Sequence, residues 1–275
     1  MEMPDQAKAR RCDLRSWLWP AACVAYVAVI LAAYLFLLTS NAVYLGWNDG
    51  LHFLGHPRMW DRLWLTMWTA TVATLFSMLV GIPVGYALSR FRFPVPYLMS
   101  TLIDLPVMVP AAAVGAFLFG FVRTFPIREI SAATGVQLAH NAQGVIFVQF
   151  VVTVAFCARL MKAAFGAVNP RFEAVSRALG ATLPRTFLRV TLPLAKRGIL
   201  ASLFVVWARA AAEWEALMLF VGGTTGQTDV MPFAVYLDWN GGMMGWCVSI
   251  SLVCVVMAMT AMGAMRIIGG KSYVW

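Results

Sequence analysis

The chain has 275 residues, of which 61% are apolar and only 12% are charged; its formal charge is +9 and its mean hydropathy +0.76. Because an ordinary soluble domain has about 25% charged residues, this composition excludes a large soluble domain. At about 20 apolar residues per helical span, the length fits about five to seven transmembrane helices with short loops.

Six apolar stretches are predicted to form these helices, which gives an all-α polytopic membrane protein with a single transmembrane domain over residues 1–275. Helices are expected because the hydrocarbon interior offers no partner for free backbone groups. The first stretch follows a basic region, but it is longer than the about 7 to 15 apolar residues of a signal peptide, so we interpret it as a retained span. The six stretches are residues 17–38, 63–88, 98–121, 144–161, 194–221 and 246–268.

The basic residues predict the orientation of the chain. With the N-terminus in the cytoplasm, most of the 21 Lys and Arg residues fall on the cytoplasmic side, and Arg209 lies within a span. This asymmetry follows the positive-inside rule, so the charge requires no nucleic-acid partner. Both termini are expected in the cytoplasm, in a protein of the plasma (inner) membrane. The cytoplasmic set is Lys8, Arg10, Arg11, Arg15, Arg90, Arg92, Arg159, Lys162, Arg171, Arg177, Arg185, Arg189, Lys196, Arg197, Arg266 and Lys271, and the outer set is Arg58, Arg62, Arg123 and Arg128.

Metal, disulfide and catalytic sites are not expected. The cysteines are odd in number and lie mostly in apolar runs, where a thiol behaves as a small hydrophobic group. The histidines stand apart from them in predicted outer loops. GGKS at residues 269–272 lacks the glycine that a phosphate-binding loop needs five positions before Gly270, where Met265 stands, so this chain is not expected to bind ATP. The residues in question are Cys12, Cys23, Cys157, Cys247, Cys254, His52, His56 and His140.

The second span contains GIPVG at residues 81–85, which places Gly81 and Gly85 four residues apart around Pro83. Small residues at this spacing allow a neighbouring helix to approach closely, whereas a proline can kink a helix. Close packing is the favoured interpretation, and a gating role is the alternative.

The longest cytoplasmic loop, residues 162–197, has a pattern of its own. Asn169 as N-cap and Pro170 at the first position predict a helix start, and Gly180 predicts its end. The spacing of Phe172, Val175 and Leu179 forms an apolar stripe that faces away from Glu173, Ser176 and Arg177. A second short helix is expected over residues 184–190, with Pro193 opening the fifth span. The loop is either an amphipathic segment on the lipid surface or a rigid two-helix elbow offered to a soluble partner.

This loop resembles the coupling loop, or EAA loop, of binding-protein-dependent ABC importer permeases. The family pattern is Glu-Ala-Ala, three residues, Gly, and later a Leu-Pro before the next span. This chain has Glu173, Ala174, Gly180, Leu192 and Pro193 in the same order. It departs from the pattern in having Val175 for the second Ala and four residues, not three, before Gly180. We call residues 162–197 the coupling segment.

The resemblance implies a permease subunit that works as a homodimer, with ATP and Mg²⁺ bound by a separate ATPase subunit and with an external solute-binding protein. Most of the chain is similar to permeases for molybdate, tungstate and sulfate, although AEWEA at residues 212–216 replaces the Gly-Glu-Phe-Gly-Ala often found there. Some molybdate permeases carry a C-terminal sensor domain. The chain stops at Trp275, so feedback inhibition through this subunit is not expected.

Charged residues at membrane depth require a partner or a cavity. In the fifth span Arg209 and Glu213 are four residues apart and are expected to pair on one helix face, whereas Glu215 lies about 200° further round a continuous helix. These residues either hold helices together at a dimer interface or line the translocation path. Asp104, near the inner end of the third span, is interpreted as a structural cap, with a gate as the alternative.

The competing functional class is a secondary transporter or channel that needs no ATPase. Such a chain would normally show internal repeats, and no convincing repeat is present. An intramembrane enzyme is a third possibility, which the absence of a polar catalytic set in the sequence disfavours.

Overall fold

Every regular element among the described residues is a helix, as the sequence predicts. The computed structural model describes residues 6–45, 52–91, 101, 105–124, 129, 140–224 and 226–269. It consists of two compact units, Met1–His52 and Phe53–Trp275. The helices with determined bounds are α1 (Gln6–Leu45), α3 (Pro57–Arg90), α5 (Ala111–Arg123), α7 (Ala142–Gly166), α8 (Pro170–Ala178), α9 (Leu183–Thr186), the π-helical turn η1 (Phe187–Thr191), α10 (Leu192–Ala211), α11 (Glu215–Phe220), α12 (Met231–Asn240) and α13 (Met244–Gly269).

Five of the described helices are long and apolar enough to cross a membrane. They agree with the first, second, fourth, fifth and sixth predicted spans, with ends that differ by several residues. In α1 the apolar part is Trp19–Asn41, and none of its most apolar stretch is buried within the protein. The other four candidates are Pro57–Arg90, Ala142–Gly166, Leu183–Ala211 and Met244–Ile267.

The predicted third span, residues 98–121, is not one continuous helix in its described part. A short helical turn at residues 105–108 ends before Pro110, and α5 begins at Ala111 as a 13-residue apolar helix. Proline has no backbone N–H and its ring clashes with the preceding turn, which accounts for the interruption.

Helices α3 and α7 pack closely because the GIPVG glycines leave room for the α7 backbone. A Cβ at Gly81 would lie 2.5 Å from Cys157 Sγ, and a Cβ at Gly85 would overlap Met161 and lie 2.7 Å from the Lys162 nitrogen. Membrane helices associate through such packing, since lipid offers no hydrophobic drive between them. The close-packing interpretation of Gly81 and Gly85 is therefore confirmed.

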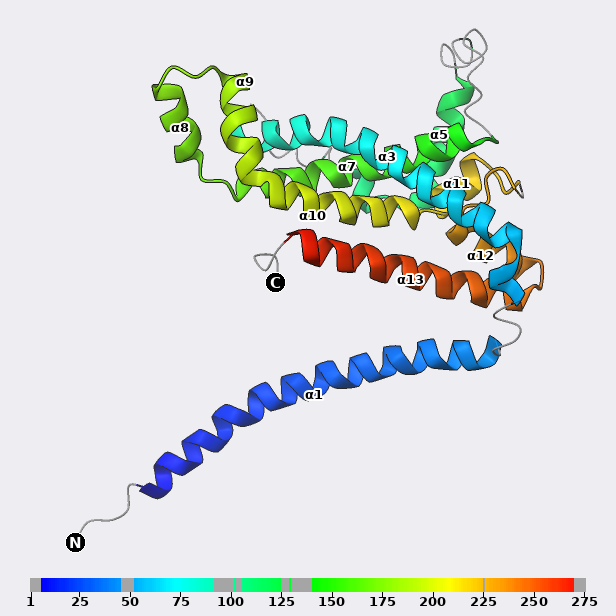
Figure 1. Ribbon diagram of the computed structural model, residues 1–275, viewed down its shortest axis with the longest axis horizontal. Coiled ribbons are helices and arrows are strands. Elements are labelled where there is room, and N and C mark those ends of the chain that lie inside the picture. Colours follow the sequence, from blue (N-terminus) through cyan, green and yellow to red (C-terminus); the bar gives the residue numbers. More distant parts are fainter. Residues whose placement is uncertain are drawn as a thin grey trace. The chain divides into compact units, whose positions relative to one another are not determined.

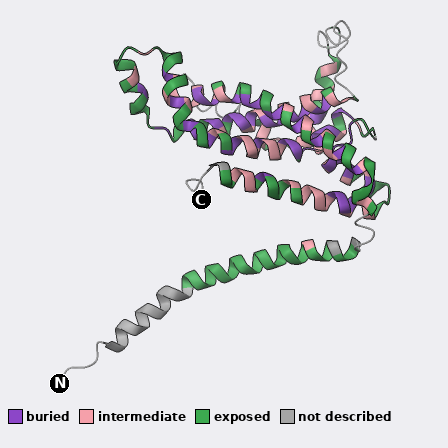
Figure 2. Ribbon diagram, viewed as in Figure 1, coloured by how far each residue is buried: buried purple, intermediate pink, exposed green. Residues whose placement is uncertain are grey.

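Figure 1 shows α3, α7 and α10 side by side, with α8 and α9 near one end of these helices and α12 near the other. Many residues of these helices are buried, whereas most of α8 is exposed (Figure 2). One buried cluster joins α7, α11 and α12 through Val148, Leu217 and Phe233. A second joins α3, α7 and α10 through Met78 and Val206, among others. The segments with candidate functions thus lie at the two ends of the α3–α7–α10 bundle, with α8 and α9 at one end and α12 at the other.

Candidate functional site

The first helix of the coupling segment forms where the sequence predicts it. The Asn169 side chain accepts a hydrogen bond of 3.0 Å from the Arg171 nitrogen, and Pro170 occupies the first position of α8. At the other end Gly180 has φ +85° and donates its N–H to the Arg177 carbonyl over 3.0 Å. Only glycine adopts this left-handed conformation cheaply, so the predicted cap is confirmed.

The apolar stripe of α8 remains exposed after folding. Phe172 is 56% exposed, Val175 60% and Leu179 84%, whereas Glu173 is buried. An amphipathic helix normally buries its apolar face against its own protein. In α8 the Glu173 carboxylate packs against the helix bundle instead, and the apolar side chains remain available for contact with another molecule.

Glu173 is buried because three side chains from other elements bind its carboxylate. Arg90 Nε, at the end of α3, donates to Oε1 over 2.8 Å, and Thr191 Oγ1 donates to the same oxygen over 2.9 Å. The Tyr86 hydroxyl donates to Oε2 over 3.3 Å. Arg90 also donates from Nη2 to the Val168 carbonyl, 2.8 Å away, just before α8. The Glu of the family pattern thus fixes α8 to the α3 end of the bundle.

The predicted break between a second short helix and the fifth span is wrong. Helix α9, the turn η1 and α10 are continuous from Leu183 to Ala211, so Leu192 and Pro193 lie inside one helix. The π-helical turn makes this possible: Leu192 donates to the carbonyl of Phe187, five residues earlier, just before the proline that cannot donate. In membrane helices, local π adjustments of this kind provide new partners for the backbone groups that a proline frees.

The coupling segment is also tied together internally. The hydroxyls of Ser176 in α8 and Thr186 in α9 are 3.2 Å apart. Ala174, the second residue of the family pattern, is exposed beside the apolar stripe. The pattern residues therefore divide into one anchor, Glu173, one chain reversal, Gly180, and a surface-facing Ala174.

The predicted fifth span, residues 194–221, is interrupted at its far end. Helix α10 ends at Ala211, and α11 starts at Glu215. The predicted pair is present across this break: Arg209 Nη1 lies 2.7 Å from Glu213 Oε2. Glu213 Oε1 also accepts the Ala216 N–H over 3.0 Å. The carboxylate therefore stabilises the first turn of α11, whose N–H groups have no partner within their own helix.

Glu215 takes no part in this ion pair. It lies half-buried in the first turn of α11, and the angle expected for a continuous helix does not apply because the backbone changes direction at residues 212–214. Gly115 of α5 lets α5 and α11 approach closely, since a Cβ at Gly115 would lie 2.8 Å from the Ala216 Cα. Asp104 lies outside the described residues.

An open cavity of about 490 Å³ adjoins the break. Its walls come from Ala212, Trp214, α12 and α13, and Trp214, Tyr236 and Trp239 provide aromatic surface. Cys247, Ser251 and Cys254 line the α13 side. Among the described residues, no group of three His, Cys, Asp or Glu side chains is suited to hold a metal ion.

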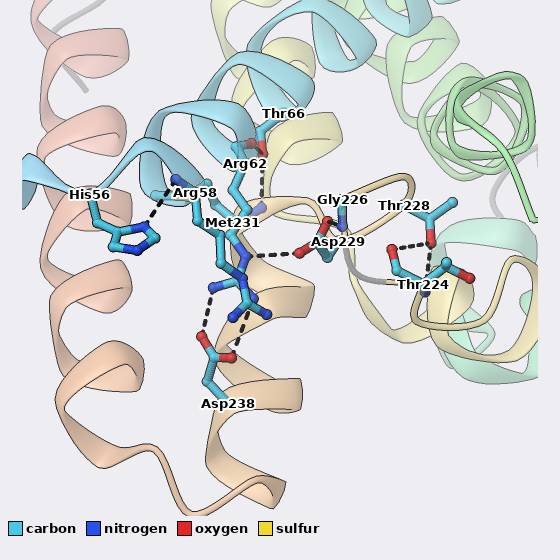
Figure 3. Close-up of polar contacts among 10 residues, drawn as sticks. All are labelled: His56, Arg58, Arg62, Thr66, Thr224, Gly226, Thr228, Asp229, Met231 and Asp238. Carbon is cyan, nitrogen blue, oxygen red and sulfur yellow. Dashed lines mark hydrogen bonds and ion pairs between the residues drawn. The ribbon is translucent and has the colours of Figure 1, made fainter. Parts of the chain in front are cut away.

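At the opposite end of the bundle from α8, Arg62 forms a buried cluster that the sequence did not reveal (Figure 3). Its Nε donates to Asp229 Oδ2 over 2.8 Å, and Nη1 and Nη2 donate to the Asp238 carboxylate over 2.6 and 3.2 Å. The Thr66 hydroxyl accepts the Met231 N–H over 2.8 Å. Arg62 was expected in an outer loop, but α3 starts earlier than predicted and Arg62 is only 1% exposed.

The fold is similar to that of membrane subunits in solved ABC transporters. A chain of a bacterial alginate ABC transporter in complex with its periplasmic protein aligns with a TM-score of 0.70 and 15% identity, over 96% of each chain. A chain of the inward-facing MetNI methionine ABC transporter gives a TM-score of 0.60 and 19% identity, over 78% of this chain and 97% of that chain. At sequence identities this low, the similarity shows a shared fold and nothing more specific.

Several permease proteins are similar in sequence over more than half of the chain. The molybdenum transport system permease protein ModB of Mycobacterium tuberculosis is 28% identical and covers 82% of this chain and 84% of its own length. ModB of Escherichia coli K12 is also 28% identical, over 74% and 90% respectively. The molybdate/tungstate transport system permease protein WtpB of Pyrococcus furiosus is 34% identical, over 59% of this chain and 61% of WtpB.

The family relationship that the coupling segment indicated is confirmed. The family model of the binding-protein-dependent transport system inner membrane component matches residues 77–268, more than half of the chain. This range includes α8, its anchor Arg90 and the broken fifth span. The chain belongs to the family of inner membrane components of binding-protein-dependent transport systems.

Proposed function

We propose that this chain is the permease subunit of an ATP-driven importer and that its coupling segment docks on a separate ATPase subunit. The carrying observation is the exposed stripe of Phe172, Val175 and Leu179 on a helix whose orientation Glu173 and Arg90 fix. Exposed apolar patches on a folded protein mark sites of interaction. A fixed orientation lets α8 pass on a movement imposed by its partner.

The charge of the coupling segment defines the chemistry of that partner. Its single carboxylate, Glu173, is buried and bound to Arg90, so its free surface is basic. The receiving groove is therefore expected to have an apolar floor and carboxylates at its rim, because complementary potentials favour association. A lipid surface with anionic headgroups is the competing occupant. The basic residues are Lys162, Arg171, Arg177, Arg185, Arg189, Lys196 and Arg197.

The remaining partners follow from the same proposal. The α8 end of the bundle and both termini face the cytoplasm, in accord with the positive-inside rule. ATP and Mg²⁺ bind to the ATPase subunit. An external solute-binding protein approaches the Arg62 end, and two copies of this chain form the pathway between them.

The proposed substrate is a tetrahedral oxyanion of the molybdate or tungstate type, with sulfate as a further candidate. The support is the naming of the ModB and WtpB relatives as molybdenum and molybdate/tungstate permeases. Arg209 is neutralised by Glu213, and Glu215 adds negative charge nearby, so we assign selectivity to the solute-binding protein. A pathway role for these three residues remains the alternative to a structural one.

The test is reconstitution of the chain in nanodiscs with the ATPase and solute-binding proteins encoded beside it. Molybdate or tungstate should stimulate ATP hydrolysis, and phosphate should not. Leu179→Asp should abolish copurification of the ATPase, whereas Phe117→Ala, a change at another exposed apolar residue, in α5, should not. Retention of the ATPase by Leu179→Asp, or oxyanion transport without any ATPase, would contradict the proposal.

A further inference from the structure

Helix α3 carries an arginine near each end, and each arginine binds a segment far away in the sequence. Arg90 is its last residue, and Arg62 lies in its second turn. Arg90 holds Glu173, 83 residues away, and Arg62 holds Asp229 and Asp238, 167 and 176 residues away. At about 1.5 Å per residue, the two arginines are about 42 Å apart along the helix.

At the Arg90 end, α3 is bound to the coupling segment by three hydrogen bonds, two of which share the Glu173 carboxylate. Arg90 and Tyr86, both from α3, bind Glu173, and Arg90 also binds the Val168 carbonyl. The Arg90 and Glu173 side chains are 10% and 12% exposed. Charge-assisted hydrogen bonds shielded from water are stronger than neutral ones. A displacement of α8 therefore pulls on α3 directly, and not only on α10, which continues the coupling segment in sequence.

At the Arg62 end, α3 is bound to Asp229, Met231 and Asp238. We call residues 222–240, of which residue 225 lies outside the described part of the chain, the 222–240 segment. Arg62 makes three hydrogen bonds to Asp229 and Asp238, and Thr66 accepts the N–H of Met231 (Figure 3). The loop before α12 is itself held by Asp229, whose Oδ1 accepts the Gly226 N–H over 2.7 Å. This segment also supplies Tyr236 and Trp239 to the cavity beside the break after α10.

Between its two ends, α3 lies tightly against α7. Besides the contacts at Gly81 and Gly85, Ser77 and Thr153 share a hydrogen bond of 2.8 Å. Packed interiors shift between discrete arrangements and do not deform continuously. A movement that enters at Arg90 would therefore act on α3 where it is packed tightly against α7, from Ser77 to Gly85, and α3 continues from there without interruption to Arg62.

We propose that α3 transmits the ATP-driven movement of α8 to the 222–240 segment, with Arg90 and Arg62 as its two attachment points. The proposal rests on the function proposed above. It assigns to Arg90 and Asp238 a positioning role in transport that is distinct from docking of the ATPase. Coupling between two sites is reciprocal, so loading of the external binding protein should also change the hydrogen–deuterium exchange of α8.

The experiment uses the reconstituted complex with its ATPase and binding protein, and measures hydrogen–deuterium exchange with and without vanadate-trapped nucleotide. In the unsubstituted complex, trapping should change exchange in the 222–240 segment. Arg90→Gln should remove most of that change and lower transport about fivefold or more, the lower end of typical coupling. Transport should fall more than the ATP hydrolysis of those complexes that retain their ATPase. Arg266→Gln, at an exposed residue in the last turn of α13, is the control and should respond as the unsubstituted complex does.

Asp238→Asn tests the opposite end and covers the case in which Arg90→Gln fails to assemble. Arg62 keeps Asp229 in this variant, so the fold should persist. The loaded binding protein should then no longer change exchange at residues 169–186. A full response of the 222–240 segment in Arg90→Gln, or of residues 169–186 in Asp238→Asn, would overturn the proposal. An unsubstituted chain that binds no ATPase would instead overturn the proposed function.

Discussion

Arg209 Nη1 lies 2.7 Å from Glu213 Oε2 at the end of α10, and the other oxygen of the same carboxylate binds the first turn of α11. One buried side chain therefore joins the two helices across the break in the fifth span. The partners are unequal, because the Arg209 side chain is 39% exposed and that of Glu213 only 1%.

This difference in exposure predicts that Arg209→Met lowers the stability of the protein more than Glu213→Gln does. Arg209→Met strands a buried carboxylate, whereas Glu213→Gln keeps an oxygen for the Ala216 N–H and leaves a cation that water can reach. Breaking a fully buried pair costs about 3 to 5 kcal/mol, and the exposure of Arg209 should reduce this to no more than about 3 kcal/mol.

The measurement is the thermal stability of the detergent-solubilised complex for both single variants and the double variant, with transport recorded in parallel. The double variant should recover part of the loss from Arg209→Met. Additive losses would argue against the pairing energy. Altered transport at unchanged stability would instead place both residues in the pathway.

Gly85→Ala should destabilise the protein through the contact between α3 and α7. Its Cβ would overlap Met161 and approach the Lys162 backbone, so the helices would have to separate. Overpacking of this kind costs about 1 to 3 kcal/mol. Gly120→Ala in α5 is the matched control, because nothing lies within 4 Å of its Cβ position. Thermal melting should separate the two variants, and equal melting temperatures would refute the close-packing argument.

Gly180→Val should misdirect the coupling segment without crowding it. The site has open space but φ +85°, a conformation that costs an L-residue about 1 to 2 kcal/mol. Transport and ATPase copurification should both fall. Gly180→Asn should be milder, since asparagine tolerates this conformation better. Unimpaired transport by a normally expressed Gly180→Val complex would count against the coupling role.

Arg62→Lys should be a poor replacement despite its equal charge. The guanidinium reaches two carboxylates with three nitrogens, whereas an ammonium group is a compact point charge that cannot reproduce this fork. Loss of one charged hydrogen bond with both carboxylates still buried should cost about 1 to 3 kcal/mol. Chemical or thermal denaturation of the purified complex would measure this, and wild-type stability in Arg62→Lys would show that the cluster does not hold the 222–240 segment.

Local sequence signals predicted much of the structure. Asn169, Pro170 and Gly180 fixed the ends of α8 through backbone chemistry that depends only on neighbouring residues. The four-residue spacing of Arg209 and Glu213 predicted a pair that is present, although Glu213 lies just beyond the last residue of α10. Prolines were less reliable: Pro193 suggested a break, but a π-helical turn just before it keeps the helix continuous.

The amino-acid sequence by itself determined the apolar helices, the membrane class and the coupling pattern, because hydropathy, capping and i, i+4 spacing act over a few residues. Only the tertiary structure decided that α8 turns Glu173 inward and its apolar stripe outward, and that Arg62 meets Asp229 and Asp238. Those contacts join residues 83 to 176 positions apart. No local rule specifies them, because they depend on which helix ends are brought together when α3, α7 and α10 pack.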